Sequence, residues 1–78
     1  MPEIFRKEGF VVSFYSGDGH EPIHVHVRKA GGEAKIWVEP IQVEYGKRME
    51  WQDLKRAEEL VAENIDLIKM RWHEYFGS

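Results

Sequence analysis

The hydrophobic period of this chain changes once, near Gly46, and that change limits the folds open to it. Before Gly46 apolar and polar residues alternate, which is typical of strands with two different faces. After Gly46 apolar residues recur at steps of three and four, which is typical of one face of a helix. Since such a helix cannot bury its apolar stripe alone, a sheet must supply the other half of the core. The pattern predicts an α+β fold.

The alternation is clearest over residues 23–29, IHVHVRK. One face of this strand is aliphatic and the other carries two histidines and an arginine: Ile23, Val25 and Val27 against His24, His26 and Arg28. A turn at residues 30–32 separates this strand from residues 33–39, EAKIWVE, which alternate in the same way. So short a glycine-rich connection predicts an antiparallel hairpin.

Three further strands are expected in the first 45 residues. Residues 10–16 are rich in aromatics and end at the turn sequence GDG, and residues 41–45 follow Pro40, which cannot donate to a sheet. A weaker signal over residues 3–7 indicates an edge strand. Together the segments predict an antiparallel β-meander of four to five strands within residues 3–45.

Residues 50 to about 74 are predicted to form one long C-terminal helix packed across one face of the sheet. The face with Val25 and Val27 is expected to receive the helix, because it is the apolar face. A chain of 78 residues has room for one domain, spanning residues 1–78. The stripe expected to enter the core includes two tryptophans and is widened by Leu60 and Leu67; its other members are Trp51, Leu54, Ala57, Val61, Ile65, Ile68 and Trp72.

If the helix covers the valines, the strand histidines project from the opposite face, with imidazoles that are partly accessible. Histidines at i and i+2 on a strand can meet at one divalent metal ion. Because the chain has no cysteine, such a site must use nitrogen and oxygen ligands. The plainer interpretation is that these histidines only hydrogen-bond to backbone or glutamates. The candidate ligands are Asp18, His20, His24 and His26, with Glu21 as a further carboxylate.

The same strand supports two other interpretations. A histidine pair beside a lysine could act as general base and general acid, with His24, His26 and Lys35 as candidate catalytic residues. Alternatively, the face could bind a protein, since an open sheet face that carries a tryptophan is an apolar patch, and such patches usually mark an interface. That binding surface would consist of His24, His26, Arg28, Lys35 and Trp37.

Five segments carry a family resemblance that covers nearly the whole chain: Tyr15-Ser16, Asp18, Glu21-Pro22-Ile23-His24-Val25-His26-Val27, Glu33-Ala34-Lys35-Ile36 and Trp72-His73-Glu74-Tyr75-Phe76-Gly77. They resemble the bacterial domain of unknown function 4160 family, DUF4160. The family's central box is similar to Pro-Pro-His-x-His-Val, so Ile23 replaces the second proline here and both histidines remain. The family has no established activity. Its members are often encoded beside another small domain, and the resemblance therefore implies a toxin-antitoxin-like pair.

These observations lead to two functional hypotheses. The first is a small interaction domain, one component of a toxin-antitoxin-like pair, whose protein partner is the neighbouring-gene product or a second copy of the chain. The second is a metal-dependent or histidine-based hydrolase or nuclease that uses the same strand, so the sequence leaves open whether the protein is an enzyme. No apolar run has the length of a signal peptide or a membrane span, which predicts a cytoplasmic protein without a membrane partner.

Nucleic acid is a further candidate partner, because Trp37 could stack on bases while Arg28 and Lys35 contact phosphates. The formal net charge is −3, so we expect no measurable binding of generic RNA at physiological salt. An electrophoretic mobility shift assay over a series of salt concentrations checks this. A robust shift that weakens steeply with salt, and less steeply after Arg28→Ala and Lys35→Ala, would contradict the expectation.

Overall fold

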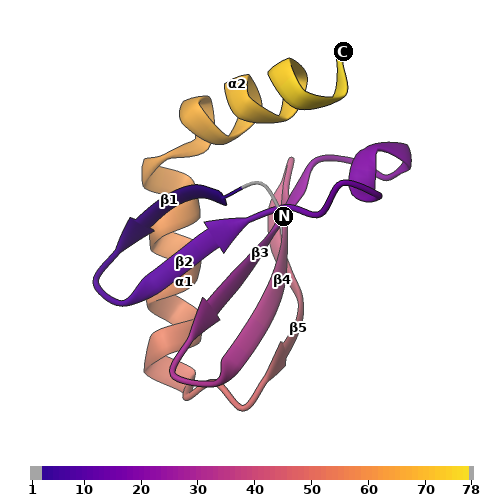
Figure 1. The fold of residues 1–78 in the computed structure, drawn as a ribbon. Coiled ribbons are helices and arrows are strands. Elements are labelled where there is room, and N and C mark those ends of the chain that lie inside the picture. Colours follow the sequence, from indigo (N-terminus) through magenta and orange to yellow (C-terminus); the bar gives the residue numbers. More distant parts are fainter. Residues whose placement is uncertain (1–2, 78) are drawn as a thin grey trace.

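The computed structural model describes residues 3–77 as an open five-stranded sheet followed by two helices (Figure 1). A short 3-10 helix, η1 (Asp18–His20), lies between the second and third strands. The strands are β1 (Glu3–Lys7), β2 (Phe10–Ser13), β3 (His24–Lys29), β4 (Gly32–Val38) and β5 (Ile41–Lys47), and the helices are α1 (Trp51–Glu63) and α2 (Ile65–Phe76). The predicted α+β class is confirmed.

The sheet is an antiparallel meander in which each strand pairs with the next along the chain. A two-residue turn joins β3 to β4, and its residues, Ala30 and Gly31, have φ angles of 50° and 83°. Positive φ at both positions matches the twist of a tight hairpin, and glycine adopts it without strain. The predicted meander is confirmed, although β2 ends at Ser13 and not at residue 16. Phe14 leaves the sheet there and packs edge-on against Trp72 of α2.

One side of the sheet, here called the inner face, forms the hydrophobic core with the helices. Val12, Val27 and Ala34 share one cross-strand row of this face, and Val25 and Ile36 share the next. All five side chains are buried. As predicted, the helical stripe meets this aliphatic face, and its buried members are Ala57, Leu60, Val61, Ile68 and Trp72.

The C-terminal segment forms two helices, and the prediction of one continuous helix is wrong. Asn64 breaks it, with φ −122° and ψ 24°, and its Nδ2 donates a 2.8 Å hydrogen bond to the carbonyl of Leu60. One straight helix over residues 51–76 would be about 39 Å long, whereas the longest dimension of the molecule is 34 Å. The break lets α1 lie against β4 and β5 while α2 turns across the end of the sheet toward β1 (Figure 1).

The two tryptophans of the predicted helical stripe have different environments. Trp72 is 3% exposed and belongs to the core, as predicted. Trp51 is 72% exposed, so its assignment to the core is wrong. Trp51 is the first residue of α1, and the Lys55 Nζ lies 5.4 Å from the centre of its ring. The helical period continues to Trp51, but the buried part of α1 begins later, at Ala57.

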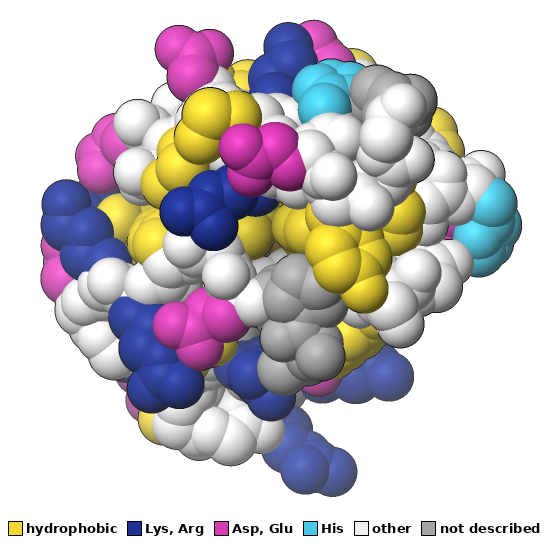
Figure 2. Space-filling model, turned by 45° about the horizontal axis from the view of Figure 1, so that its top comes forward, with side chains coloured by type: hydrophobic (Ala, Val, Ile, Leu, Met, Phe, Trp, Pro, Cys, Tyr) yellow, Lys and Arg dark blue, Asp and Glu magenta, His cyan; other side chains and the backbone are white. Residues whose placement is uncertain are grey.

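The surface on the α2 side of the molecule is mixed in character (Figure 2). Apolar side chains reach this surface in patches that charged side chains interrupt, and Met70 and Tyr75 of α2 are exposed. Mixed surfaces of this kind are normal where a protein meets water. Within residues 3–77, neither helix combines the length and the apolarity that crossing a bilayer requires.

The packing of α1 on the sheet can be tested with Leu60→Ala. Leu60 is fully buried in the core, so truncation should lower the free energy of unfolding by about 2 to 5 kcal/mol. Met70→Ala removes an exposed side chain of similar size and should change it by about 0.5 kcal/mol or less. Urea denaturation followed by circular dichroism measures both, and equal losses in the two variants would contradict the described core.

Candidate functional site

The opposite side of the sheet, here called the outer face, carries most of the predicted site residues. Strand pairing aligns His26 with Lys35 on β4, and Lys35 with Tyr45 on β5. The next row aligns His24 with Trp37. Paired residues point to the same side of a sheet, so these side chains meet on one face, as the alternation predicted.

The segment between β2 and β3 brings Asp18 to the two histidines. Asp18 Oδ2 lies 3.1 Å from His24 Nε2 and 3.4 Å from His26 Nε2. The same oxygen accepts a 2.9 Å hydrogen bond from the backbone N–H of Tyr15. Two backbone hydrogen bonds of 3.0 Å, from Asp18 to Tyr15 and from Glu21 to Asp18, close the segment into a compact turn. Within residues 3–77, Asp18, His24 and His26, here called the histidine cluster, form the group whose side-chain atoms lie close enough together to hold a metal ion.

His24 is completely buried, with an exposed fraction of 0%. Its ring packs edge-on against Trp37 and Trp72, with centroid distances of 5.2 and 5.4 Å. Nδ1 lies 2.9 Å from the carbonyl oxygen of Pro22, and because a carbonyl can only accept, Nδ1 carries the hydrogen. In the neutral ring, the lone pair is therefore on Nε2, the nitrogen that faces Asp18.

His26 is 6% exposed and lies beneath the ring of Tyr15, with 4.2 Å between the ring centres. Its Nδ1 is 3.4 Å from Glu33 Oε2, and the Tyr45 hydroxyl donates a 3.2 Å hydrogen bond to that oxygen. Burial lowers the pKa of His26 and outweighs the carboxylates of Asp18 and Glu33, which act in the opposite direction. The folded protein therefore favours the neutral imidazole at this position.

Lys35 and Glu21 form an ion pair at the edge of the histidine cluster. The Lys35 Nζ donates a 3.0 Å hydrogen bond to Glu21 Oε1, and that oxygen lies 3.7 Å from His24 Nε2. The bond to Lys35 lowers the pKa of the Glu21 carboxyl, which stays ionised. The ammonium group also lies 4.6 Å from the centre of the Trp37 ring. Lys35 is thus held between a carboxylate and an aromatic ring.

The prediction of partly accessible imidazoles is wrong, because both strand histidines are buried. The segment from Tyr15 to Glu21 covers His26, and α2 reaches around the end of the sheet to cover His24. Arg28, Lys35 and Trp37 are half-buried. The part of the outer face that meets solvent is therefore made by these residues and not by the histidines.

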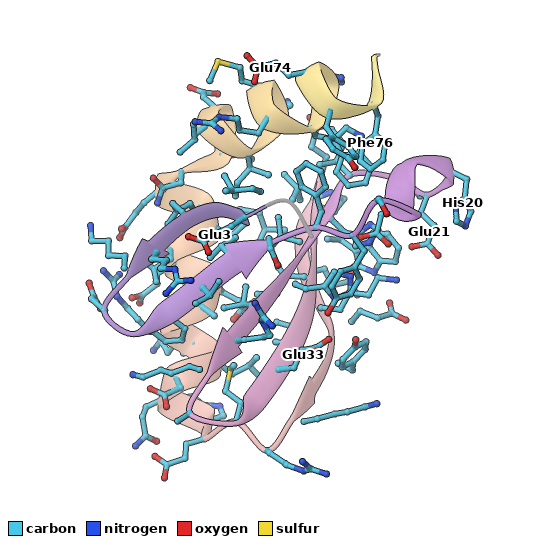
Figure 3. All side chains as sticks on the ribbon, viewed as in Figure 1. Glu3, His20, Glu21, Glu33, Glu74 and Phe76 are labelled. Atoms are coloured by element: carbon cyan, nitrogen blue, oxygen red, sulfur yellow. The ribbon has the colours of Figure 1, made fainter. Side chains whose placement is uncertain are left out.

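His20, a predicted metal ligand, lies outside the histidine cluster. It is the last residue of η1, is exposed, and points away from the sheet (Figure 3). A 3-10 helix has three residues per turn, so when Asp18 faces the histidines, a residue two positions later faces elsewhere. The structure brings together the other three candidates, with Glu21 beside them.

Sequence reasoning did not identify Glu33, Tyr45 and Trp72 as neighbours of the histidines. The hairpin register contained a signal for two of them, since Glu33 is diagonal to His26 and Tyr45 is opposite Lys35. Trp72 gave no such signal. Its contact with His24 depends on the turn between the two helices, which the helical period does not reveal.

The turn that carries Asp18 is packed against the end of α2. Phe76 lies beside this turn (Figure 3) and fills the space that a side chain at Gly19 would need, since a Cβ there would be 2.5 Å from the ring. Phe76 also contacts Phe14 and Trp72, with ring centres 5.3 and 4.5 Å away. The position of Asp18 and the packing of α2 are therefore coupled.

Comparison with known proteins gives one result. The model of the family described as "Domain of unknown function (DUF4160)" matches residues 9–73, which include the whole histidine cluster. No curated protein and no solved structure gives a significant match to the sequence.

The close packing at Gly19 predicts different effects for two neighbouring glycines. Gly19→Ala should lower the free energy of unfolding by about 1 to 3 kcal/mol, because the new methyl group overlaps the Phe76 ring. Gly17→Ala is the matched control, since nothing lies within 4 Å of its Cβ position. Thermal and urea melts of both variants provide the comparison. Phe76→Leu should reduce the cost of Gly19→Ala, and a cost that does not change would contradict the contact.

Proposed function

The chain belongs to the DUF4160 family, a family of unknown function, and we propose that it is a protein-interaction domain that binds its partner through the outer face of the sheet. One observation carries the proposal: the part of the outer face that the Tyr15–Glu21 segment and α2 leave open presents half-buried side chains that are aromatic or charged. An accessible sheet surface of this composition has the character of an interface.

The aromatic residues of the outer face are of the types that dominate binding energy. Tyr15, Trp37 and Tyr45 are all half-buried, and Arg28 lies on the same face. Tryptophan, tyrosine and arginine are enriched among the residues whose truncation costs most at protein interfaces. They supply large contact area while losing few rotatable bonds on binding.

Hydrogen bonds hold two of these side chains, Trp37 and Tyr45, in the unbound protein. Trp37 Nε1 donates a 2.7 Å hydrogen bond to Glu44, and the Tyr45 hydroxyl donates to Glu33. Glu44 has no pairing partner on β4, because the β4–β5 register shifts at this point, and its side chain is free to accept the bond from Trp37. A surface whose side chains are already ordered loses less entropy when a partner binds.

The outer face continues into a shallow hollow near the two hairpin turns. Val11, Arg28 and Glu33 share one cross-strand row and line this hollow, together with Gly9, Lys29 and residues 30–32. The outer face thus offers an aromatic patch beside a depression that is lined by positive and negative side chains. This combination suits a folded protein partner whose surface has both apolar and charged groups.

The proposed partner is the product of the neighbouring gene, as the family resemblance implies, in a toxin-antitoxin-like pair in the cytoplasm. A second copy of the chain is the alternative partner. Acid–base catalysis is less well supported, because both imidazoles are buried and Lys35 is paired with Glu21. A general base must reach the proton that it removes.

The proposed surface can be tested by comparing two tryptophans. Trp37→Ala should weaken binding of the co-expressed neighbouring-gene product by about 30-fold or more, the loss typical of a central interface residue. Trp51→Ala is the control, since Trp51 is exposed but lies on α1, on the other side of the sheet. Calorimetry on the purified pair measures both affinities.

Analytical ultracentrifugation of the chain alone tests whether the partner is a second copy of the chain. A concentration-dependent dimer that Trp37→Ala dissociates would make a second copy the partner. A chain that is monomeric and does not bind the neighbouring product, or two tryptophan variants with equal effects, would contradict an interaction function of the outer face.

A further inference from the structure

The histidine cluster has an arrangement that a network of hydrogen bonds does not explain. His24 Nε2 and His26 Nε2 are both buried, and neither makes a hydrogen bond to any described residue. Both nevertheless lie at ion-pair distance from Asp18 Oδ2, at 3.1 and 3.4 Å. Buried polar atoms without partners are rare and require an explanation.

A proton does not account for the contact between His24 and Asp18. The hydrogen on Nδ1 is used for the Pro22 carbonyl, so in the neutral ring Nε2 and the carboxylate oxygen are two acceptors that face each other. A second proton, on Nε2, would lie in the ring plane, and no described residue accepts a hydrogen bond there. A positive charge that accepts lone pairs from all three groups would satisfy them together.

The distances from Asp18 Oδ2 to the two nitrogens are those of ligands around one ion, and the ligand atoms of the three residues lie within 4.8 Å of one another. Zinc bonds to histidine and carboxylate are about 2.0 to 2.2 Å long, so two ligand atoms at a tetrahedral ion are about 3.3 to 3.6 Å apart. Octahedral coordination with bonds of the same length brings neighbouring ligands to about 3.0 Å. The observed separations of 3.1 and 3.4 Å fall within this range.

We propose that Asp18, His24 and His26 bind one divalent transition-metal ion, with Glu21 as the fourth ligand. The inference goes beyond the interaction function and does not depend on it. Glu21 is the carboxylate next to the cluster, with Oε1 3.7 Å from His24 Nε2, and as a ligand it would exchange its hydrogen bond with Lys35 for the ion. Two carboxylates balance the charge of the ion.

The groups behind the ligands orient them for this role. His24 Nδ1 donates a hydrogen bond to a backbone carbonyl, and His26 Nδ1 lies 3.4 Å from the Glu33 carboxylate without a hydrogen bond to it. Carbonyls and carboxylates are the usual outer partners of metal-bound histidines. Asp18 is held by the Tyr15 N–H. The donor atoms favour a transition-metal ion over Mg²⁺. Two imidazoles with two carboxylates suit Zn²⁺ and other divalent transition metals, whereas Mg²⁺ prefers oxygen ligands alone.

The proposal is tested by isothermal titration calorimetry of the full chain after removal of metals with EDTA. We expect one Zn²⁺ per chain and no binding of Mg²⁺. Asp18→Asn keeps the shape of the side chain and an oxygen that can accept from the Tyr15 N–H. It should weaken Zn²⁺ binding by more than about 100-fold, which exceeds the loss typical of removing a residue that only supports a metal ligand. His26→Gln should have a comparable effect, and Glu21→Gln a smaller one of about 10-fold.

Two histidines outside the cluster provide matched controls. His20 and His73 are exposed, so His20→Gln and His73→Gln should leave the affinity within about twofold of the unmodified chain. Zn²⁺ should raise the melting temperature of these controls but not that of Asp18→Asn. A circular dichroism spectrum of Asp18→Asn without metal shows whether that variant is folded.

Several results would contradict the proposed metal site. Absence of Zn²⁺ binding, equal affinity in Asp18→Asn and the unmodified chain, or a loss of binding in the His20 or His73 variant would each exclude coordination by the cluster. An unchanged affinity in Glu21→Gln would exclude Glu21 as the fourth ligand. If His26→Gln fails to fold, Asp18→Asn and Glu21→Gln still decide the outcome.

Discussion

Strand β3 is buried on both of its faces, and the remaining structure is arranged around that constraint. Its valines, Val25 and Val27, belong to the helix-covered core, while His26 lies under Tyr15 and His24 packs against Trp72 of α2. A shift of register by one residue would exchange valines and imidazoles between these two environments. The strand therefore requires a different cover on each side, an aliphatic one from α1 and a polar and aromatic one from the Asp18 turn and α2.

The histidine side of β3 can be buried because each carboxylate near the imidazoles has a polar partner. Asp18 accepts from the Tyr15 backbone, Glu21 from Lys35, and Glu33 from Tyr45. Burying a charged group without such partners costs far more than a hydrogen bond returns. The two Nε2 atoms are among the buried polar atoms of residues 3–77 that have no hydrogen-bond partner, and both lie close to the Asp18 oxygen.

Residues with a regular period were predictable from the sequence, and residues positioned by distant contacts were not. The alternation of residues 23–29 places each side chain on the face where the structure has it, because the period of a strand is a local property. The burial of His24 depends on Trp72, almost fifty positions away, and the choice of Asp18 over His20 depends on how the turn packs against Phe76. The helix break at Asn64 was also missed, because the apolar stripe continues through it.

The contact of α2 with β1 joins the first described strand to the last helix. Contacts between elements so far apart in the chain close a large loop, and the chain loses the entropy of that loop before it gains any contact energy. The hairpins β1–β2 and β3–β4, by contrast, pair segments that are adjacent in the sequence. These hairpins are therefore suited to form early in folding, while the cover over His24 is completed only when α2 reaches the sheet. The polar environment of the histidines would then be one of the last parts of the native state to form.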